Sequence, residues 1–143
     1  MAYGIRFNLP EGWNTREETY FDESGSETTH LTATVGDKRR IDVYVGDLPD
    51  GETAEDQAFA NYAEGVGFDD GDDDGGNPIL KFRMNGKTAY GFDALTEDDL
   101  PMRLISQEVR KGVIAIITYF VENDEALDEV FSLIERNLRV GGK

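Results

Sequence analysis

The chain contains no cysteine and only one histidine, His30, among its 143 residues. The lack of cysteine excludes disulfides, thiolate nucleophiles and thiolate metal sites. One histidine is too few for a multi-histidine metal cluster or for a relay between two histidines, and we interpret His30 as a polar residue that precedes a strand. The G-x-G-x-x-G, G-x-x-x-x-G-K-[ST] and G-x-S-x-G motifs are also missing. The sequence therefore predicts a protein that is not an enzyme.

Positive charge is scarce as well. There are 14 Lys and Arg residues against 30 Asp and Glu residues, which gives a formal net charge of -16. Such a charge repels nucleic acids and anionic membrane surfaces. It attracts cations and basic proteins, although solubility alone also accounts for an acidic surface. We expect a protein partner, with a basic one favoured by charge, and neither nucleic acid binding nor membrane insertion.

Long hydrophobic runs are missing apart from residues 112–121, Gly-Val-Ile-Ala-Ile-Ile-Thr-Tyr-Phe-Val. This run is too short to cross a bilayer as a helix, which takes about 20 residues. The N-terminus has no basic segment followed by an apolar run, so no signal peptide is predicted. If the chain is complete, we expect a cytoplasmic protein.

The same run indicates where the core of the fold lies, because both of its alternating faces are apolar. Val113, Ala115 and Ile117 fall on one face, and Ile114 and Ile116 fall on the other. A strand with two apolar faces lies near the middle of a sheet that is covered on both sides.

Shorter patterns predict the remaining strands. Alternating apolar and polar residues are typical of strands at residues 5–9, 31–35 and 41–45. Further strands are predicted at residues 79–84, 87–92 and 102–110, and a weaker one at residues 16–21. Asn85-Gly86 is a strong signal for a two-residue hairpin turn, and such a turn places Phe82 opposite Ala89.

Two helices are predicted between these strands. Thr53 and Asp56 have the spacing of a capping box at the start of the first helix. Asn123 is a plausible cap for the second, whose apolar residues keep helical spacing as far as Leu138, with Arg139 in its last turn. The chain therefore reads as one α+β domain over residues 1–143, with an antiparallel sheet of about six to seven strands and a helix packed on each face.

Several short motifs resemble the PsbP-like α/β/α sandwich superfamily over essentially the whole chain. They are Phe7-x-Leu9-Pro10-x-Gly12-Trp13, the hairpin–helix–hairpin order, Gly86-x-x-Ala89-Tyr90, the apolar strand after Gly112, and the ending Asn137-Leu138-Arg139-Val140. The resemblance implies an α/β/α sandwich and a non-enzymatic interaction module. Members include an extrinsic photosystem subunit, a Ran-binding import factor and bacterial adaptors of type VI secretion. The long acidic loop departs from the bacterial pattern.

That acidic loop, residues 69–77, suggests an alternative function in calcium binding. Asp70, Asp72 and Asp74, followed by Gly75, match the first half of an EF-hand loop, in which alternate carboxylates converge on the ion. The twelfth position, which should supply a bidentate Glu, is Lys81. A solvated acidic turn explains the same residues without an ion.

Four aromatic residues lie outside the predicted core faces and are candidates for partner binding: Trp13, Tyr20, Phe21 and Tyr44. Large rigid side chains contribute much of the binding energy at protein interfaces. Packing beneath the helices or along the rim of the sheet would also account for them. An edge strand could support a homodimer, so the sequence leaves a monomer and a homodimer open.

Overall fold

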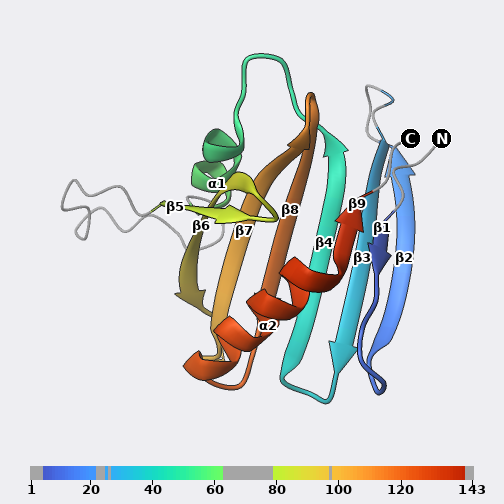
Figure 1. Cartoon of the computed structure of the whole chain (residues 1–143), viewed down its shortest axis with the longest axis vertical. Coiled ribbons are helices and arrows are strands. Elements are labelled where there is room, and N and C mark those ends of the chain that lie inside the picture. The colour runs from blue at the N-terminus through green and yellow to red at the C-terminus, as the bar shows by residue number, and fades with distance from the viewer. Residues whose placement is uncertain (1–4, 22–24, 26, 63–78, 97, 141–143) are drawn as a thin grey trace.

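The computed structural model describes residues 5–21, 25, 27–62, 79–96 and 98–140. Within these residues the chain forms nine strands and two helices (Figure 1). In chain order they are β1 (Ile5–Phe7), β2 (Asn14–Phe21), β3 (Glu27–Val35), β4 (Arg39–Asp47), α1 (Ala54–Tyr62), β5 (Leu80–Met84), β6 (Lys87–Leu95), β7 (Pro101–Arg110), β8 (Val113–Phe120), α2 (Asp124–Asn137) and β9 (Leu138–Val140).

Seven of these strands form one antiparallel sheet in the order β2-β3-β4-β8-β7-β6-β5. The apolar segment predicted to lie centrally is β8, and it does occupy the middle of the sheet between β4 and β7. Its side chains that face α2, such as Ile117 and Tyr119, are buried. On the opposite face Ile114 is buried, but Ile116 and Phe120 are only half-buried, so that side is incompletely covered.

The hairpin predicted at Asn85-Gly86 is confirmed. Both residues have positive φ angles, 55° and 80°, as the favoured two-residue hairpin turn requires. Phe82 pairs with Ala89, as the two-residue turn predicts. The β3–β4 hairpin is confirmed as well.

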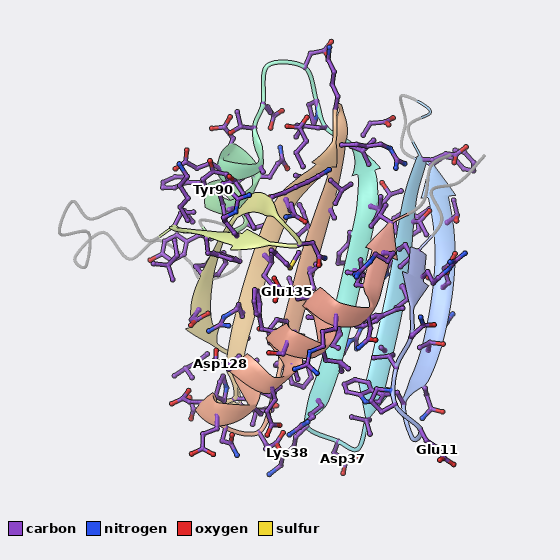
Figure 2. The ribbon with its side chains drawn as sticks, viewed as in Figure 1. Glu11, Asp37, Lys38, Tyr90, Asp128 and Glu135 are labelled. Carbon is purple, nitrogen blue, oxygen red and sulfur yellow. The ribbon has the colours of Figure 1, made fainter. Side chains whose placement is uncertain are left out.

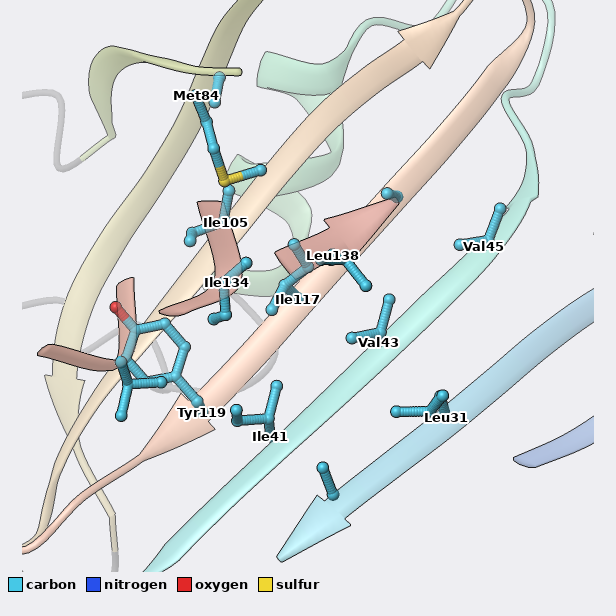
Figure 3. Close-up of a cluster of buried hydrophobic side chains, with 14 of the residues drawn as sticks. Leu31, Ile41, Val43, Val45, Met84, Ile105, Ile117, Tyr119, Ile134 and Leu138 are labelled. Carbon is cyan, nitrogen blue, oxygen red and sulfur yellow. The ribbon is translucent and has the colours of Figure 1, made fainter. Parts of the chain in front are cut away.

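Helix α2 is anchored by its cap and by one apolar stripe. The side chain of Asn123 accepts a hydrogen bond from the backbone N–H of Ala126 at 2.9 Å, which confirms the predicted cap. Val130 and Ile134, one turn apart, are fully buried in the core that also contains Ile117 (Figure 3). In Figure 1 the helix crosses this face of the sheet diagonally.

The end of this helix differs from the prediction. The helix stops at Asn137, and Leu138 has extended backbone angles of -89° and 127°. Leu138 and Arg139 belong to β9, which pairs with β1 in a separate two-stranded sheet. The helical spacing of Leu138 was misleading, because its buried side chain joins the same core from a strand.

Helix α1 begins with the predicted capping box, since Thr53 and Asp56 each bond the other's backbone N–H through their side chains. Its buried Ala58 packs with Phe92 and Leu104. The contacts of α1 with the sheet are mainly with β6 and β7.

The expected α/β/α sandwich with a helix on each face is wrong. The structure is dominated by strands, with the two-stranded β1–β9 sheet added beside the seven-stranded one. Helix α1 has 9 residues and is therefore about 14 Å long, whereas seven strands spaced about 4.8 Å apart span about 29 Å. One short helix cannot form a layer over such a sheet, and the part formed by β2, β3 and β4 carries polar side chains instead.

Candidate functional site

The side of β2, β3 and β4 that faces away from α2 carries a cluster of aromatic rings and hydrogen-bonded polar side chains. We call it the β2–β4 face. It consists of the even-numbered residues of these strands, because Leu31, Val43 and the other odd-numbered core residues face α2. The residues of the β2–β4 face used below are Arg16, Glu18, Tyr20, His30, Thr32, Arg40, Asp42 and Tyr44.

Two of the four predicted aromatic contact residues meet on this face. The rings of His30 and Tyr44 are stacked with centroids 4.1 Å apart, and Tyr20 meets His30 edge-on at 6.4 Å. Trp13 is half-buried against the core on the α2 side. Phe21 pairs with Glu27 at the end of β2 and is 65% exposed. The predicted set of four is therefore not one cluster.

His30 is central to this surface, although the sequence placed it before a strand. It lies inside β3, opposite Tyr44 of β4. Its Nε2 atom is 2.9 Å from Oδ1 of Asp42 and 3.2 Å from the hydroxyl of Thr32. A single His at an alternating strand position cannot be recognised as part of a cluster until the register of the two strands is known.

Asp42 accepts hydrogen bonds from several side chains of this cluster. The Arg40 side chain donates to Oδ2 of Asp42 at 2.9 Å, and the Thr32 hydroxyl donates to Oδ1 at 3.1 Å. Burial alone would raise the pKa of Asp42, but the hydrogen bonds from Arg40, His30 and Thr32 outweigh it and lower the pKa below its ordinary value. Burial, together with the nearby acids, raises the pKa of the Tyr20 and Tyr44 phenols. Asp42 is therefore a carboxylate, and both tyrosines are neutral hydrogen-bonding groups near neutral pH.

The arrangement of His30, Asp42 and Thr32 differs from the catalytic relay of a serine protease. Such a relay uses one imidazole nitrogen toward the acid and the other toward the nucleophile. Here the same nitrogen of His30 faces both Asp42 and Thr32. The arrangement is suited to holding the aromatic rings of Tyr20, His30 and Tyr44 in fixed positions at the surface.

Strand β2 forms the outer side of this face and is an edge of the seven-stranded sheet. Each of its eight residues is exposed. Arg16 and Glu18 form an ion pair of 2.6 Å along the strand, which contributes little stability because both side chains are well solvated. The edge is therefore regular, accessible and charged.

An ion-pair cluster on the other side of the molecule joins β4 to α2 and to the turn before α2. Arg39, at the start of β4, makes hydrogen bonds to both oxygens of Glu122, at 2.7 and 2.6 Å, and to Glu129 of α2 at 3.2 Å. Hydrogen bonds from Arg39 lower the pKa of Glu122 from 4.5 to about 2.

We expect the contact between Arg39 and Glu122 to make the free energy of unfolding depend on pH in the acidic range. Because the pKa of Glu122 is lower in the folded state, its contribution is complete above about pH 4.5 and is lost as the pH falls toward 2. The side chain is 35% exposed, so water screens the pair and the contribution is about 1 kcal/mol or less. Urea titrations from pH 6 to 2 should show that the stability difference between the wild type and Glu122→Gln shrinks over this range. In an Arg39→Gln background the difference should change much less with pH, because only the backbone hydrogen bond at Glu122 still lowers its pKa. Parallel curves in the wild-type background would contradict the assignment.

The predicted calcium ligands Asp70, Asp72 and Asp74 lie outside the described residues, so that site stays a prediction. In the part of the chain that the structure does describe, no group of three or more His, Asp or Glu side chains is placed to hold a metal ion. No helix within the described ranges is long and apolar enough to cross a membrane.

Comparison of the chain with protein-family models, with curated proteins and with solved structures gave no match. The resemblance to the PsbP-like superfamily therefore stays a prediction.

Proposed function

We propose that the protein is a non-enzymatic binding protein that engages a protein partner through the β2 edge and the β2–β4 face. One observation carries the proposal: β2 is an eight-residue edge strand that is exposed at every position, and its Tyr20 contacts the stacked, partly buried pair of His30 and Tyr44. An accessible edge strand can accept an extended segment of another protein as an additional strand.

Charge favours a basic segment as the added strand. Glu17 and Glu18 project from opposite sides of β2, and the chain as a whole carries a charge of -16. Antiparallel pairing of β2 with a second copy, centred on Glu17 or on Glu18, would place two identical carboxylates opposite each other, which is destabilising. A partner strand with Lys or Arg at these positions would instead form cross-strand ion pairs.

The aromatic cluster supplies the apolar contact that an added strand needs. Tyr20 is 42% exposed, and its position is restricted by the stacked pair of His30 and Tyr44. Rigid, partly exposed aromatic side chains that need little ordering are the usual centres of binding energy at interfaces.

A peptide titration tests the proposal directly. The probe is an eight-residue peptide of alternating Lys and Val, and the readout is the set of backbone amide NMR signals of the protein. We expect the largest changes at β2, with Arg16 and Tyr20 among them, and weaker binding as salt is added. The same peptide with alternate backbone nitrogens methylated should not bind, because it cannot donate ladder hydrogen bonds.

Matched variants separate strand addition from general attraction to an acidic protein. Glu17→Gln/Glu18→Gln should weaken binding by up to about fivefold, since the alternating peptide can place Lys opposite only one of these two neighbouring carboxylates and an exposed ion pair contributes under about 1 kcal/mol. Glu11→Gln/Asp37→Asn removes the same charge from exposed turns beyond the ends of β2, β3 and β4 (Figure 2) and should change the affinity less than twofold. Equal losses in both variants, or equal binding of the methylated peptide, would refute the proposal.

A further inference from the structure

A pocket of about 350 Å³ lies on the α2 side of the sheet, far in the strand order from the β2 edge. Its walls come from the β5–β6 hairpin and from the segment where α2 passes into β9, and its floor comes from β7 and β8. The floor contains the apolar residues Val109, Ala115 and Ile117 and the amide of Gln107, and Leu138 closes one side. Its volume is at the lower end of the range for small-molecule sites, about 300–1,000 Å³.

Two cationic side chains line the pocket, Lys87 on the hairpin and Arg139 on β9. No Asp or Glu residue lines it. The Lys87 ammonium donates to the carbonyl oxygen of Val109, and Arg139 Nη1 donates to the carbonyl oxygens of Glu135 and Leu138. Within the described residues, neither cation forms an ion pair with a carboxylate. Both charges are therefore oriented by neutral backbone oxygens and are available to an anion, in a chain where acids outnumber bases by 30 to 14.

The hairpin wall of the pocket is held in place by side chains below and beside it. Gln107, only 3% exposed, donates from Nε2 to the carbonyl oxygens of Met84 and Lys87, at 2.8 and 3.3 Å. Glu135 of α2 lies between the helix and the hairpin (Figure 2) and accepts the backbone N–H of Asn85 at 3.2 Å. A wall that is fixed before the ligand arrives lowers the entropic cost of binding.

We infer that this pocket binds a small monocarboxylate with a short apolar tail. The carboxylate would lie between Lys87 and Arg139, whose N–H groups suit a carboxylate, and the tail would cover Val109 and Val140, the half-buried apolar residues of the lining. The overall negative charge opposes an anion only at long range, since the Debye length is about 8 Å at physiological ionic strength. An inorganic anion would leave the apolar part of the pocket exposed to water. An organic cation would be repelled by both basic side chains.

Hexanoate, hexanol and acetate are suitable probes, titrated separately at about 0.15 M salt while the backbone amide NMR signals of Gln107 and Ala115 and the side-chain amide signals of Gln107 are followed. We expect hexanoate to bind at least about tenfold more tightly than hexanol, because hydrogen bonds to a charged group contribute about 1.5 kcal/mol or more. Acetate should bind at least about tenfold more weakly than hexanoate, because it lacks the tail.

A charge-matched pair of variants completes the test. Lys87→Gln/Arg139→Gln should reduce hexanoate affinity to that of hexanol. Lys81→Gln/Arg136→Gln removes one cation from the same hairpin and one from the end of α2, and neither of these residues lines the pocket; its affinity should stay within about twofold of the wild type. The inference is overturned if hexanol binds as tightly as hexanoate, if the signal changes fall away from Gln107 and Ala115, or if both double variants lose affinity equally. None of these outcomes depends on the peptide experiment at β2.

Discussion

Replacing Gly91 by alanine is expected to destabilise the protein by about 3 kcal/mol or more, a loss at the upper end of overpacking effects. Gly91 lies in β6, between Leu80 of β5 and Ile105 of β7. A Cβ atom at this position would lie 2.0 Å from the carbonyl oxygen of Leu104 and 3.1 Å from its carbon. The obstacle is backbone rather than the end of a flexible side chain, so the strands themselves must move apart.

Thermal unfolding followed by circular dichroism would measure this effect, with an expected fall in Tm of about 10 °C or more. Gly46→Ala is the matched control, because its Cβ would meet the Thr28 hydroxyl oxygen at 3.1 Å and the Glu27 carbonyl oxygen at 3.3 Å. That crowding is milder, so we expect a clearly smaller loss. A melting temperature of Gly91→Ala within about 2 °C of the wild type would show that β6 and β7 are not packed as closely as described.

Ile134→Ala should lower the free energy of unfolding by about 3 kcal/mol, within the range for removing a buried Ile side chain. Ile134 has no exposed surface and belongs to the apolar stripe that joins α2 to the core containing Ile105 and Ile117 (Figure 3). The deletion removes apolar contact and leaves a cavity between two rigid elements, which can close only in part.

Urea denaturation measures this change, and Leu95→Ala provides the comparison. Leu95 is a similar aliphatic residue at the end of β6, but it is 64% exposed. Its removal should change stability by no more than about 0.5 kcal/mol. If the two variants lost similar amounts, α2 would not be packed on the sheet through Ile134.

Much of the local structure could be predicted because its causes are local. The Asn85-Gly86 turn, the capping box of Thr53 and Asp56, and the Asn123 cap are each determined by residues a few positions apart, and all are present. The central position of β8 followed from its two apolar faces.

What could not be predicted depends on contacts between distant residues. Whether Leu138 continues the helix or starts β9 depends on β1, more than 100 positions earlier in the chain, with which it pairs at Phe7. The cover over the second face of the sheet was overestimated, because periodicity shows which side chains are apolar and not how far a short helix extends. Ile116 and Phe120 are apolar and yet only half-buried.

The candidate site was predictable in part. Tyr20 and Tyr44 could be proposed as partner-binding residues from their residue type alone. Their meeting around His30 required the register of two hairpins, which places Tyr44 opposite His30 and Glu18 on its other side. The pocket beside Lys87 and Arg139 could not be foreseen, because it depends on where α2 ends and on how the β5–β6 hairpin folds over the sheet.

The position of β8 also has a consequence for how the chain folds. Strands β2, β3 and β4 form one meander and β5 to β8 form another, and within the large sheet they are joined only by the pairing of β4 with β8. That pairing closes the segment of residues 48–112, at an entropic cost about 3 kcal/mol above that of a three-residue turn. We expect it to form late. Until it does, the most apolar strand of the protein has one open edge, and such an edge favours aggregation. The native fold protects this strand by enclosing it between β4 and β7.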